Sequence, residues 1–257
     1  METKLNMKKG FVDREGRFFD HVLSIDYKEV GPLTEINLSH NDYIYDFYGD
    51  MDNIIKYIYR SKIDPNVCVR YYGDYGYALM PYSDGIFLHE DDMRMVDALQ
   101  RRQSLVKKTV FPFGVLTCNN KIVGQLSYYV DNATTLLDFV KSGKCSKMNL
   151  LLIYKELVTV LKEMIDADIC YSDVHGKNVM VDNTSNKPLL IDFDSAYVYF
   201  GRSICLSTAI GNYIDMVNKF NAMLGLDTDL GVWKKPESYD SAYDQACSMI
   251  RKLENKR

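Results

Sequence analysis

Three polar side chains at fixed spacing constrain this chain more than any other feature of its sequence. Residues 171–178 read Tyr-Ser-Asp-Val-His-Gly-Lys-Asn, which separates Asp173 from Asn178 by four residues. A second acid, Asp192, follows nineteen residues after Asp173 and is flanked by apolar side chains. Magnesium binds oxygen ligands of this kind, and phosphoryl transfer from ATP also needs a carboxylate that orients the attacking hydroxyl. The spacing therefore predicts a site for metal and phosphate.

The residues around these side chains predict a helix, a loop and a hairpin. Apolar residues recur at helical spacing over residues 148–165, as in a helix that packs on a core. Residues 178–181 and 188–191 predict two short strands, and the polar cluster at residues 182–186 predicts the turn between them. The second strand leads directly into Asp192. Helix, loop, hairpin and acid thus follow in the order that the chemistry requires.

The loop and the residues around Asp192 resemble the catalytic loop and metal-binding motif of the protein-kinase-like superfamily. The match is closer to the atypical branches, such as aminoglycoside and choline phosphotransferases and other bacterial kinase-like proteins, which often carry D-x-H-x-x-N. The resemblance implies that Asp173 acts as the base or orients the acceptor hydroxyl. It also implies that Asn178 and Asp192 bind the metal. Typical protein kinases begin the loop with H-R-D, whereas Tyr171 and Ser172 stand in those places here.

Two further residues of the loop are candidates that also have a simpler interpretation. His175 lies where typical kinases carry a phosphate-contacting lysine, and the resemblance makes it a candidate catalytic residue beside Asp173. Taken alone, a histidine here is typical of a loop hydrogen bond. Lys177 is a candidate for binding the cofactor, and its alternative is a solvated charge. Because aspartate and asparagine favour turns, only the whole set with its helix and hairpin predicts the site.

The segment before the loop predicts the end of a small lobe and a hinge. Residues 113–117 and 121–130 predict two strands joined by a turn. In the resemblance, residues 131–134 form the hinge whose backbone contacts adenine. Asp131 and Asn132 are therefore candidate cofactor-binding residues.

Farther upstream, the expected elements are present but the expected residues are not. Residues 90–107 predict a helix in the place of the regulatory helix, and residues 67–72 and 76–80 predict a hairpin. In the resemblance Met80 occupies the position of the phosphate-binding lysine, and the helix has no glutamate in its middle. No G-x-G-x-x-G sequence precedes the hairpin. Met80 is thus expected beside the cofactor, without the charge of a lysine.

Two alternatives follow from these departures. In one, the register of the strands differs and another cation, such as Lys56, Lys62 or Arg70, contacts the phosphates. In the other, nucleotide binding is weakened and the protein is a slow enzyme or a pseudokinase.

The sequence after Asp192 predicts a shortened helical lobe. Residues 207–224 predict a helix that Gly225 ends, and residues 238–256 predict a last helix. No A-P-E segment is present and there is no room for a long activation loop. We therefore expect a small substrate rather than a docked peptide. At the other end of the chain, residues 11–19 predict a hairpin.

Composition argues against several classes of partner. The formal net charge of −4, with no basic run, argues against nucleic acid or an anionic membrane surface. The six cysteines form no C-x-x-C pair, which predicts reduced thiols in a cytosolic protein and no zinc site. The chain shows neither an apolar signal core at its start nor an apolar run long enough for a membrane span. We therefore expect a cytoplasmic protein without membrane contact.

The sequence thus predicts an α+β fold of the two-lobed, protein-kinase-like kind. Residues 1–130 would form a small β-rich lobe with one regulatory-type helix, and residues 131–257 a mainly helical, shortened lobe with the catalytic loop. The expected activity is phosphoryl transfer from ATP, with Mg²⁺, to an unidentified, small hydroxyl-bearing substrate. The expected partners are a nucleotide and an unknown small-molecule or protein substrate. The alternative is an inactive pseudokinase that acts as a binding or scaffolding module.

Overall fold

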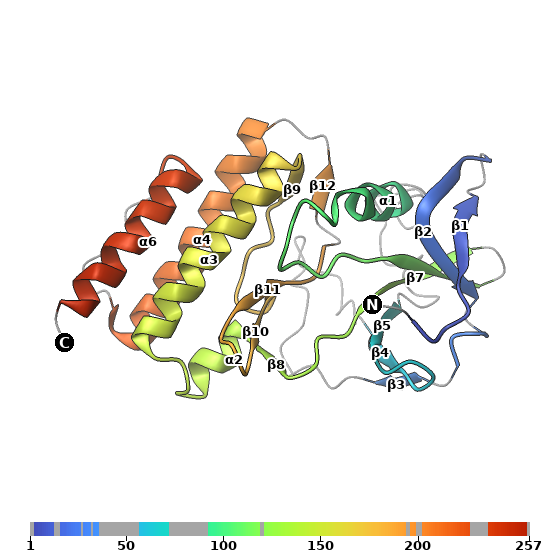
Figure 1. Ribbon diagram of the computed structural model, residues 1–257, viewed down its shortest axis with the longest axis horizontal. Coiled ribbons are helices and arrows are strands. Elements are labelled where there is room, and N and C mark those ends of the chain that lie inside the picture. Colours follow the sequence, from blue (N-terminus) through green and yellow to red (C-terminus); the bar gives the residue numbers. More distant parts are fainter. Residues whose placement is uncertain are drawn as a thin grey trace, which may run out of the picture. The chain divides into compact units, whose positions relative to one another are not determined.

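The structure is a computed structural model of the 257-residue chain. It describes residues 3–12, 16–26, 28–31, 33–35, 57–71, 92–118, 121–193, 196–198, 202–226 and 236–255. The chain divides into two compact units. The first consists of Met1–Arg101 and Phe111–Asp131, and the second of Arg102–Val110 and Asn132–Arg257. Strands dominate the first unit and helices the second, so the protein is of mixed α+β class (Figure 1).

Seven strands form one sheet in the described part of the first unit, in the order β1-β2-β6-β7-β5-β4-β3. Every neighbouring pair is antiparallel except β2 and β6, which are parallel. The predicted hairpin over residues 11–19 is confirmed by the pairing of β1 with β2, and the two strands before the predicted hinge are confirmed as β6 and β7. The strands are β1 (Lys8–Val12), β2 (Phe18–Asp26), β3 (Leu33–Glu35), β4 (Tyr57–Ser61), β5 (Val67–Tyr71), β6 (Gly114–Cys118) and β7 (Lys121–Tyr128).

Apolar residues pack on both faces of this sheet. Val115 and Leu116 are neighbours on β6 and therefore point to opposite faces. Val115 packs in a cluster that includes Val96 of helix α1 (Asp92–Arg102). Leu116 belongs to the other cluster, whose buried members are Leu5, Ile25, Val30, Val67, Val69, Phe113, Leu116 and Leu126. The sheet is therefore the centre of the hydrophobic core of the first unit.

Strand β5 differs from the sequence prediction. Residues 67–72 were expected to form a hairpin with residues 76–80, which lie outside the described residues. The structure pairs one edge of β5 with β4 and the other with β7. The hairpin thus forms with the strand that precedes β5, which the sequence analysis does not predict. The tyrosines and the isoleucine of β4 show no clear alternation of apolar and polar residues.

Helix α1 is shorter than the predicted helix over residues 90–107. It ends at Arg102, and the segment Arg102–Val110 belongs to the second unit although the sequence predicts it within residues 1–130. Lys108 has a φ of 61°, which a helix does not accommodate. Beyond it the N–H of Val110 donates to the carbonyl of Leu190 at 2.9 Å. Residues 103–105 form a turn, in which the N–H of Leu105 donates to the carbonyl of Arg102 at 2.9 Å, before the chain pairs with β11 (Pro188–Leu190).

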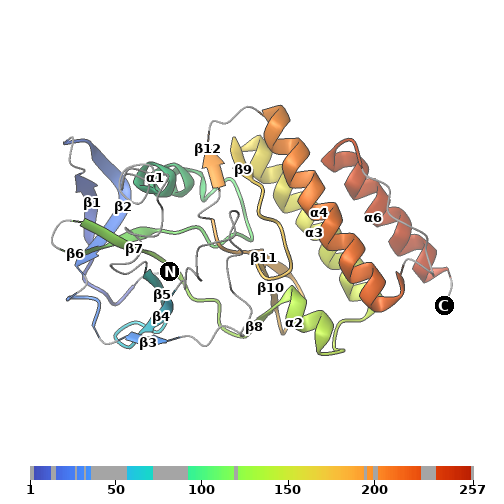
Figure 2. The same cartoon turned by 180° about the vertical axis from the view of Figure 1, so that it is seen from behind.

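Helices and two small sheets make up the described part of the second unit (Figure 2). The predicted helix over residues 148–165 is confirmed as α3, and the predicted hairpin before Asp192 is confirmed by the antiparallel pairing of β10 with β11. The sheets have the orders β11-β10-β8 and β12-β9. The elements are β8 (Ala133–Thr135), α2 (Leu136–Lys141), α3 (Lys147–Asp166), β9 (Ile169–Tyr171), β10 (Val179–Asp182), β11 (Pro188–Leu190), β12 (Ala196–Val198), α4 (Arg202–Leu224) and α6 (Tyr239–Glu254).

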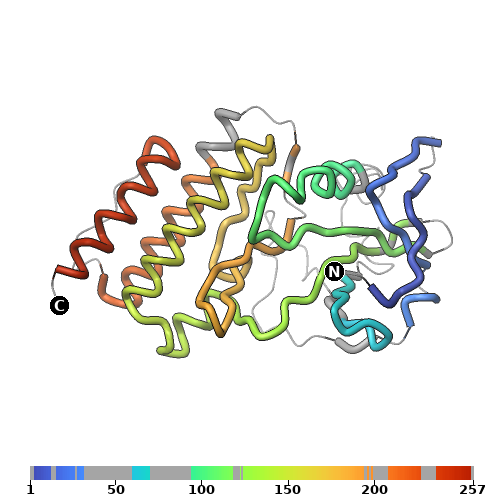
Figure 3. Tube along the Cα trace, viewed as in Figure 1, coloured from blue at the N-terminus to red at the C-terminus, as the bar shows by residue number. Residues whose placement is uncertain are grey.

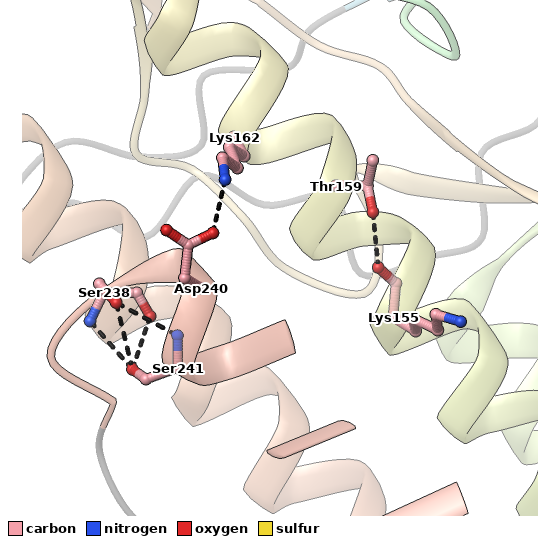
Figure 4. A network of polar contacts seen from close by, with 6 residues as sticks. All are labelled: Lys155, Thr159, Lys162, Ser238, Asp240 and Ser241. Carbon is pink, nitrogen blue, oxygen red and sulfur yellow. Dashed lines mark hydrogen bonds and ion pairs between the residues drawn. The ribbon is translucent and has the colours of Figure 1, made fainter. Parts of the chain in front are cut away.

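Helix α3 packs against both α6 and α4, and the trace shows the three helices running alongside one another (Figure 3). The hydroxyl of the buried Tyr154 lies 3.3 Å from the carbonyl of Val217 on α4, and that of Tyr213 donates to the carbonyl of Tyr154 at 3.3 Å. Helix α4 begins at Arg202, earlier than the predicted residue 207, and α6 agrees with the predicted last helix. The carboxylate of Asp240 on α6 pairs with Lys162 of α3 (Figure 4). This bundle supports the loop that follows α3.

Candidate functional site

The loop over residues 171–178 is fixed against two helices. The carbonyl of Gly176 accepts from the N–H of Leu137 at the start of α2, at 3.0 Å. A Cβ atom at Gly176 would lie 2.3 Å from Cζ of Phe220 on α4, so only glycine fits this close approach. The side-chain amide of Asn212, also on α4, donates to the carbonyl of Ser172. These contacts fix the backbone of the loop that carries the predicted catalytic side chains.

The structure brings Asp173 and Asn178 into direct contact. The side-chain nitrogen of Asn178 donates to the Asp173 carboxylate at 2.8 Å and to the Asp173 backbone carbonyl at 3.1 Å. A carboxylate and a carbonyl oxygen can only accept hydrogen bonds, so the end of the amide that faces them is the nitrogen. The Asn178 residue is 5% exposed, whereas the Asp173 side chain is 43% exposed. A buried amide thus orients a carboxylate that solvent and small molecules can reach.

His175 lies on the other carboxylate oxygen of Asp173. Its Nε2 is 3.4 Å from Oδ1 of Asp173, and its Nδ1 accepts from the backbone N–H of Lys177 at 3.2 Å. Because Nδ1 is an acceptor, the neutral ring carries its proton on Nε2, toward the carboxylate. The sequence offered a catalytic residue or a loop hydrogen bond for His175, and the ring makes that loop hydrogen bond while it also contacts Asp173.

The two strands of the hairpin bring the backbone of Asp192 close to that of Asn178. Val179 of β10 is opposite Leu190 of β11, and the N–H of Ile191 donates to the carbonyl of Asn178 at 3.0 Å. Asp192 follows with a φ of 64°, a left-handed conformation that aspartate adopts more readily than most residues with a Cβ atom.

The side-chain oxygen of Asn178 is suited to a metal ion. Its nitrogen is taken by Asp173, and within the described part of the chain no group donates a hydrogen bond to its Oδ1. A buried acceptor without a donor costs free energy, which a bound cation offsets. Magnesium commonly takes one or two side chains and completes its shell with phosphate oxygens and water. That Asn178 and Asp192 form such a pair stays a prediction, and among the described residues no three His, Cys, Asp or Glu side chains form a cluster that could hold a metal ion.

The predicted hinge residues fall in different units. Asp131 is the last residue of the first unit, and its carboxylate accepts from Arg60 at 2.9 Å. Arg60 also lies over the ring of Tyr129, 4.1 Å from its centroid, and its Nε donates to the carbonyl of Pro65. The sequence analysis passed over Arg60, because nothing local distinguishes it from a solvated charge.

Asn132 is the first residue of the second unit and is hydrogen-bonded to the turn of the β10–β11 hairpin. Its side-chain nitrogen donates to Oγ1 of Thr184 at 2.8 Å, and its carbonyl accepts from the N–H of Asn183 at 2.9 Å. Its φ of 53° is one that asparagine tolerates well. The side chain and carbonyl of Asn132 are therefore engaged by the hairpin turn.

The remaining candidate residues have little or no described surroundings. Met80 and Lys56 lie outside the described residues, and the side chain of Arg70 is likewise not described. Lys62 is exposed in the turn between β4 and β5. Lys177 is half-buried, and its backbone N–H bonds to His175.

One cysteine departs from the predicted reduced state. Cys68, Cys145 and Cys247 are free thiols, as predicted, but Cys170 on β9 is disulfide-bonded. The absence of a C-x-x-C pair did not reveal this, because pairing depends on the distance between Cα atoms in the fold and not on spacing along the chain. Burial raises the pKa of the Cys145 thiol to about 11.

Comparison with known proteins assigns the chain to no family. No protein-family model matches the chain, and no curated protein matches its sequence. Over the described residues, no helix combines the length and the apolar character that crossing a membrane requires.

Proposed function

We propose that the protein is an ATP- and magnesium-dependent phosphotransferase with a two-lobed, protein-kinase-like fold. The chain forms a β-rich unit with one helix and a mainly helical unit, and it passes into the second for the last time between Asp131 and Asn132, where the resemblance puts the hinge. The acceptor is a small hydroxyl-bearing molecule. The exposure of the Asp173 carboxylate supports this role, because an acceptor hydroxyl can reach it.

The observation that carries the proposal is the double hydrogen bond from Asn178 to Asp173. It holds one carboxylate oxygen of Asp173 in place and turns the amide oxygen of Asn178 away from that carboxylate. The same residue thus orients the base and presents a buried oxygen for the metal.

The chemistry follows from these positions. The acceptor hydroxyl donates its hydrogen bond to Asp173, its oxygen forms a bond to the γ-phosphorus of ATP, and the bond from that phosphorus to the bridging oxygen of ADP breaks. The hydroxyl proton passes to Asp173, which His175 contacts on its second oxygen. Asn178 and Asp192 would hold magnesium, which would supply compensation for the charge of the phosphate oxygens. Orientation and charge compensation, rather than covalent catalysis, are the contributions of the protein.

A specific observation favours a second candidate, a pseudokinase that serves as a binding module. Asp97 lies in the middle of α1, the helix in the place of the regulatory helix. Its carboxylate accepts from Arg101 of the same helix at 2.7 Å and from the N–H of His21 on β2 at 3.2 Å. Asp97 therefore has partners already and does not replace the missing glutamate as partner of a phosphate-binding lysine.

A thermal-shift measurement with magnesium and ATP separates the two candidates. A ligand at about 100 times its dissociation constant stabilises the folded state by about 2.7 kcal/mol. We expect this shift for the wild type and for Asp173→Asn, which keeps an acceptor for Asn178, together with loss of phosphoryl transfer in Asp173→Asn. Asp192→Ala should abolish the magnesium-dependent part of the shift. A wild type that shows no shift would favour a binding module without nucleotide.

A further inference from the structure

Cys170 forms a disulfide in a chain that also keeps free thiols. Cys68, Cys145 and Cys247 are free, so none of these three is its partner. In the reducing cytosol, which the sequence predicts for this protein, disulfides are typically transient and serve catalysis or redox sensing. Structural disulfides are instead typical of secreted proteins. The coexistence of free thiols with a bonded cysteine therefore favours a bond that opens and closes.

The bond lies in one of two very short strands. Cys170 is the middle residue of β9 and lies opposite Tyr197 of β12, and each of these strands has three residues. A pair this short shares few hydrogen bonds, and β9 is otherwise held by packing on α3 and α4. A disulfide removes conformational freedom that an opened strand would regain. The bond at Cys170 thus adds a restraint to β9 that its short pairing with β12 does not supply.

Strand β9 leads into the loop that carries Asp173, three residues after Cys170. In the later part of this loop, the carbonyl of Gly176 accepts from a backbone N–H at the start of α2. Before Asp173, the carbonyl of Ser172 accepts from the side chain of Asn212 on α4. Neither hydrogen bond involves Cys170. Opening the disulfide should therefore loosen the start of the loop, which follows β9, and leave the part at Gly176 in place.

We propose that the disulfide at Cys170 is a redox switch for the loop that carries Asp173. In the oxidised protein the bond holds the start of the loop and keeps Asp173 in position. In the reduced protein this part of the loop opens more often. The inference rests on the proposed function only in taking Asp173 as the residue that orients the acceptor hydroxyl.

A dithiol reductant opens the bond in two steps. Its first thiolate attacks one sulfur of the disulfide, forms a mixed disulfide and releases the other cysteine. Its second thiol then attacks the reductant's own sulfur in the mixed disulfide and releases the first cysteine. Two electrons and two protons pass to the protein, which leaves two cysteine thiols and a cyclic, oxidised reductant. Because Cys170 is 7% exposed, the reductant reaches it when β9 opens, and reduction is slow.

The test compares the oxidised and the reduced wild type by hydrogen exchange. The protein is equilibrated either with an oxidising glutathione buffer or with dithiothreitol, and peptide mapping of the oxidised form should find Cys170 in a disulfide. We expect reduction to speed exchange of the amides of residues 171–174 by about tenfold or more, and exchange in α6 to change much less. ATP turnover should fall on reduction and recover on reoxidation.

Two alanine variants provide the matched comparison. Cys170 and Cys145 are both buried cysteines of the second unit, but Cys145 is a free thiol. Cys170→Ala should exchange like the reduced wild type at residues 171–174 and should no longer respond to reductant. Cys145→Ala should keep the response of the wild type.

The exchange rates separate this inference from the proposed function. If mapping finds no disulfide at Cys170 in the oxidised protein, the inference is overturned. It is also overturned if reduction speeds exchange in α6 as much as in residues 171–174, which would mark a purely structural bond. If the wild type neither binds nor turns over ATP, the proposed function fails and the exchange rates alone decide on Cys170. Should Cys170→Ala not fold, the reversible response of the wild type still decides.

Discussion

Gly176 and Gly211 lie in the same unit but have different surroundings. A Cβ atom at Gly176 would approach the ring of Phe220 to 2.3 Å, and that ring is 1% exposed and has little room to move. A Cβ atom at Gly211, inside α4, would meet nothing within 4 Å. The first glycine is thus required by packing, whereas the second only weakens its helix.

Alanine substitutions should therefore change stability in opposite directions. We expect Gly176→Ala to lower the free energy of unfolding by about 1–3 kcal/mol because of overpacking. We expect Gly211→Ala to raise it by about 0.5–1 kcal/mol because alanine favours the helix. Urea unfolding of the two variants beside the wild type measures both changes. Equal stability of Gly176→Ala and the wild type would contradict the close packing of the loop.

The lowered pKa of Asp64 makes the stability of the first unit depend on pH. Burial alone would raise the pKa of Asp64, but backbone N–H donors at Lys4 and Asn66 outweigh it and hold the pKa below its ordinary value of 3.8. A carboxyl whose pKa is lower in the folded state contributes stability above its unfolded pKa. That stability is lost as the pH falls through the folded pKa.

The Asp64→Asn variant tests this dependence. It should be less stable than the wild type at about pH 6, and the difference in unfolding free energy should narrow as the pH falls below about 4, the usual range of an aspartate, and through the lowered pKa of the folded carboxyl. Chemical denaturation across this range measures the difference. A gap that stays constant with pH would show that the charge of Asp64 is not what stabilises this turn.

At the scale of elements, α6 begins with a capping box. The hydroxyl of Ser238 accepts from the N–H of Ser241 at 3.2 Å, and the N–H of Ser238 donates back to the Ser241 hydroxyl at 3.1 Å (Figure 4). The same figure shows Lys162 of α3 paired with Asp240. The cap satisfies backbone groups that would otherwise lack partners, whereas this ion pair is exposed to solvent.

The cap and the ion pair should contribute differently to the free energy of unfolding. Ser238→Ala should lower the free energy of unfolding by about 1 kcal/mol, because the first turn of α6 loses its cap. Lys162→Ala should cost much less, since solvent screens the pair. Thermal unfolding of both variants decides the order. A larger loss in Lys162→Ala than in Ser238→Ala would reverse this assignment.

The sequence predicts elements well where their patterns are local. The apolar period of α3 and the turn cluster between β10 and β11 are visible within single windows of sequence. Strands β9 and β12 have three residues each, too few to show alternation. The parallel pairing of β2 with β6 joins distant segments and leaves no local signal.

The candidate site follows the same division. The spacing of Asp173, Asn178 and Asp192 predicts which residues matter, and the hairpin predicts that the last two are neighbours along the backbone. The hydrogen bond from Tyr171 to Ile191 links a side chain to a distant carbonyl, which no spacing reveals. The disulfide at Cys170 is missed for a similar reason.

At the scale of the whole molecule, the chain enters the second unit twice. The segment Arg102–Val110 joins it before the rest of that unit begins at Asn132. There Lys108 pairs with Glu156 of α3 at 2.7 Å, and the carbonyl of Lys108 accepts from the N–H of Leu190 at 3.0 Å. A single boundary after residue 130 cannot describe this course, because the segment pairs with a strand far along the chain.

The central claim is that Asn178 and Asp192 bind magnesium together with ATP. The most direct measurement is calorimetric titration of the wild type with ATP, with and without magnesium, and of Asp192→Asn under the same conditions. The claim predicts that magnesium strengthens ATP binding to the wild type and has little effect on the variant. Magnesium dependence that is equal in the wild type and in Asp192→Asn, or absent from both, would contradict it.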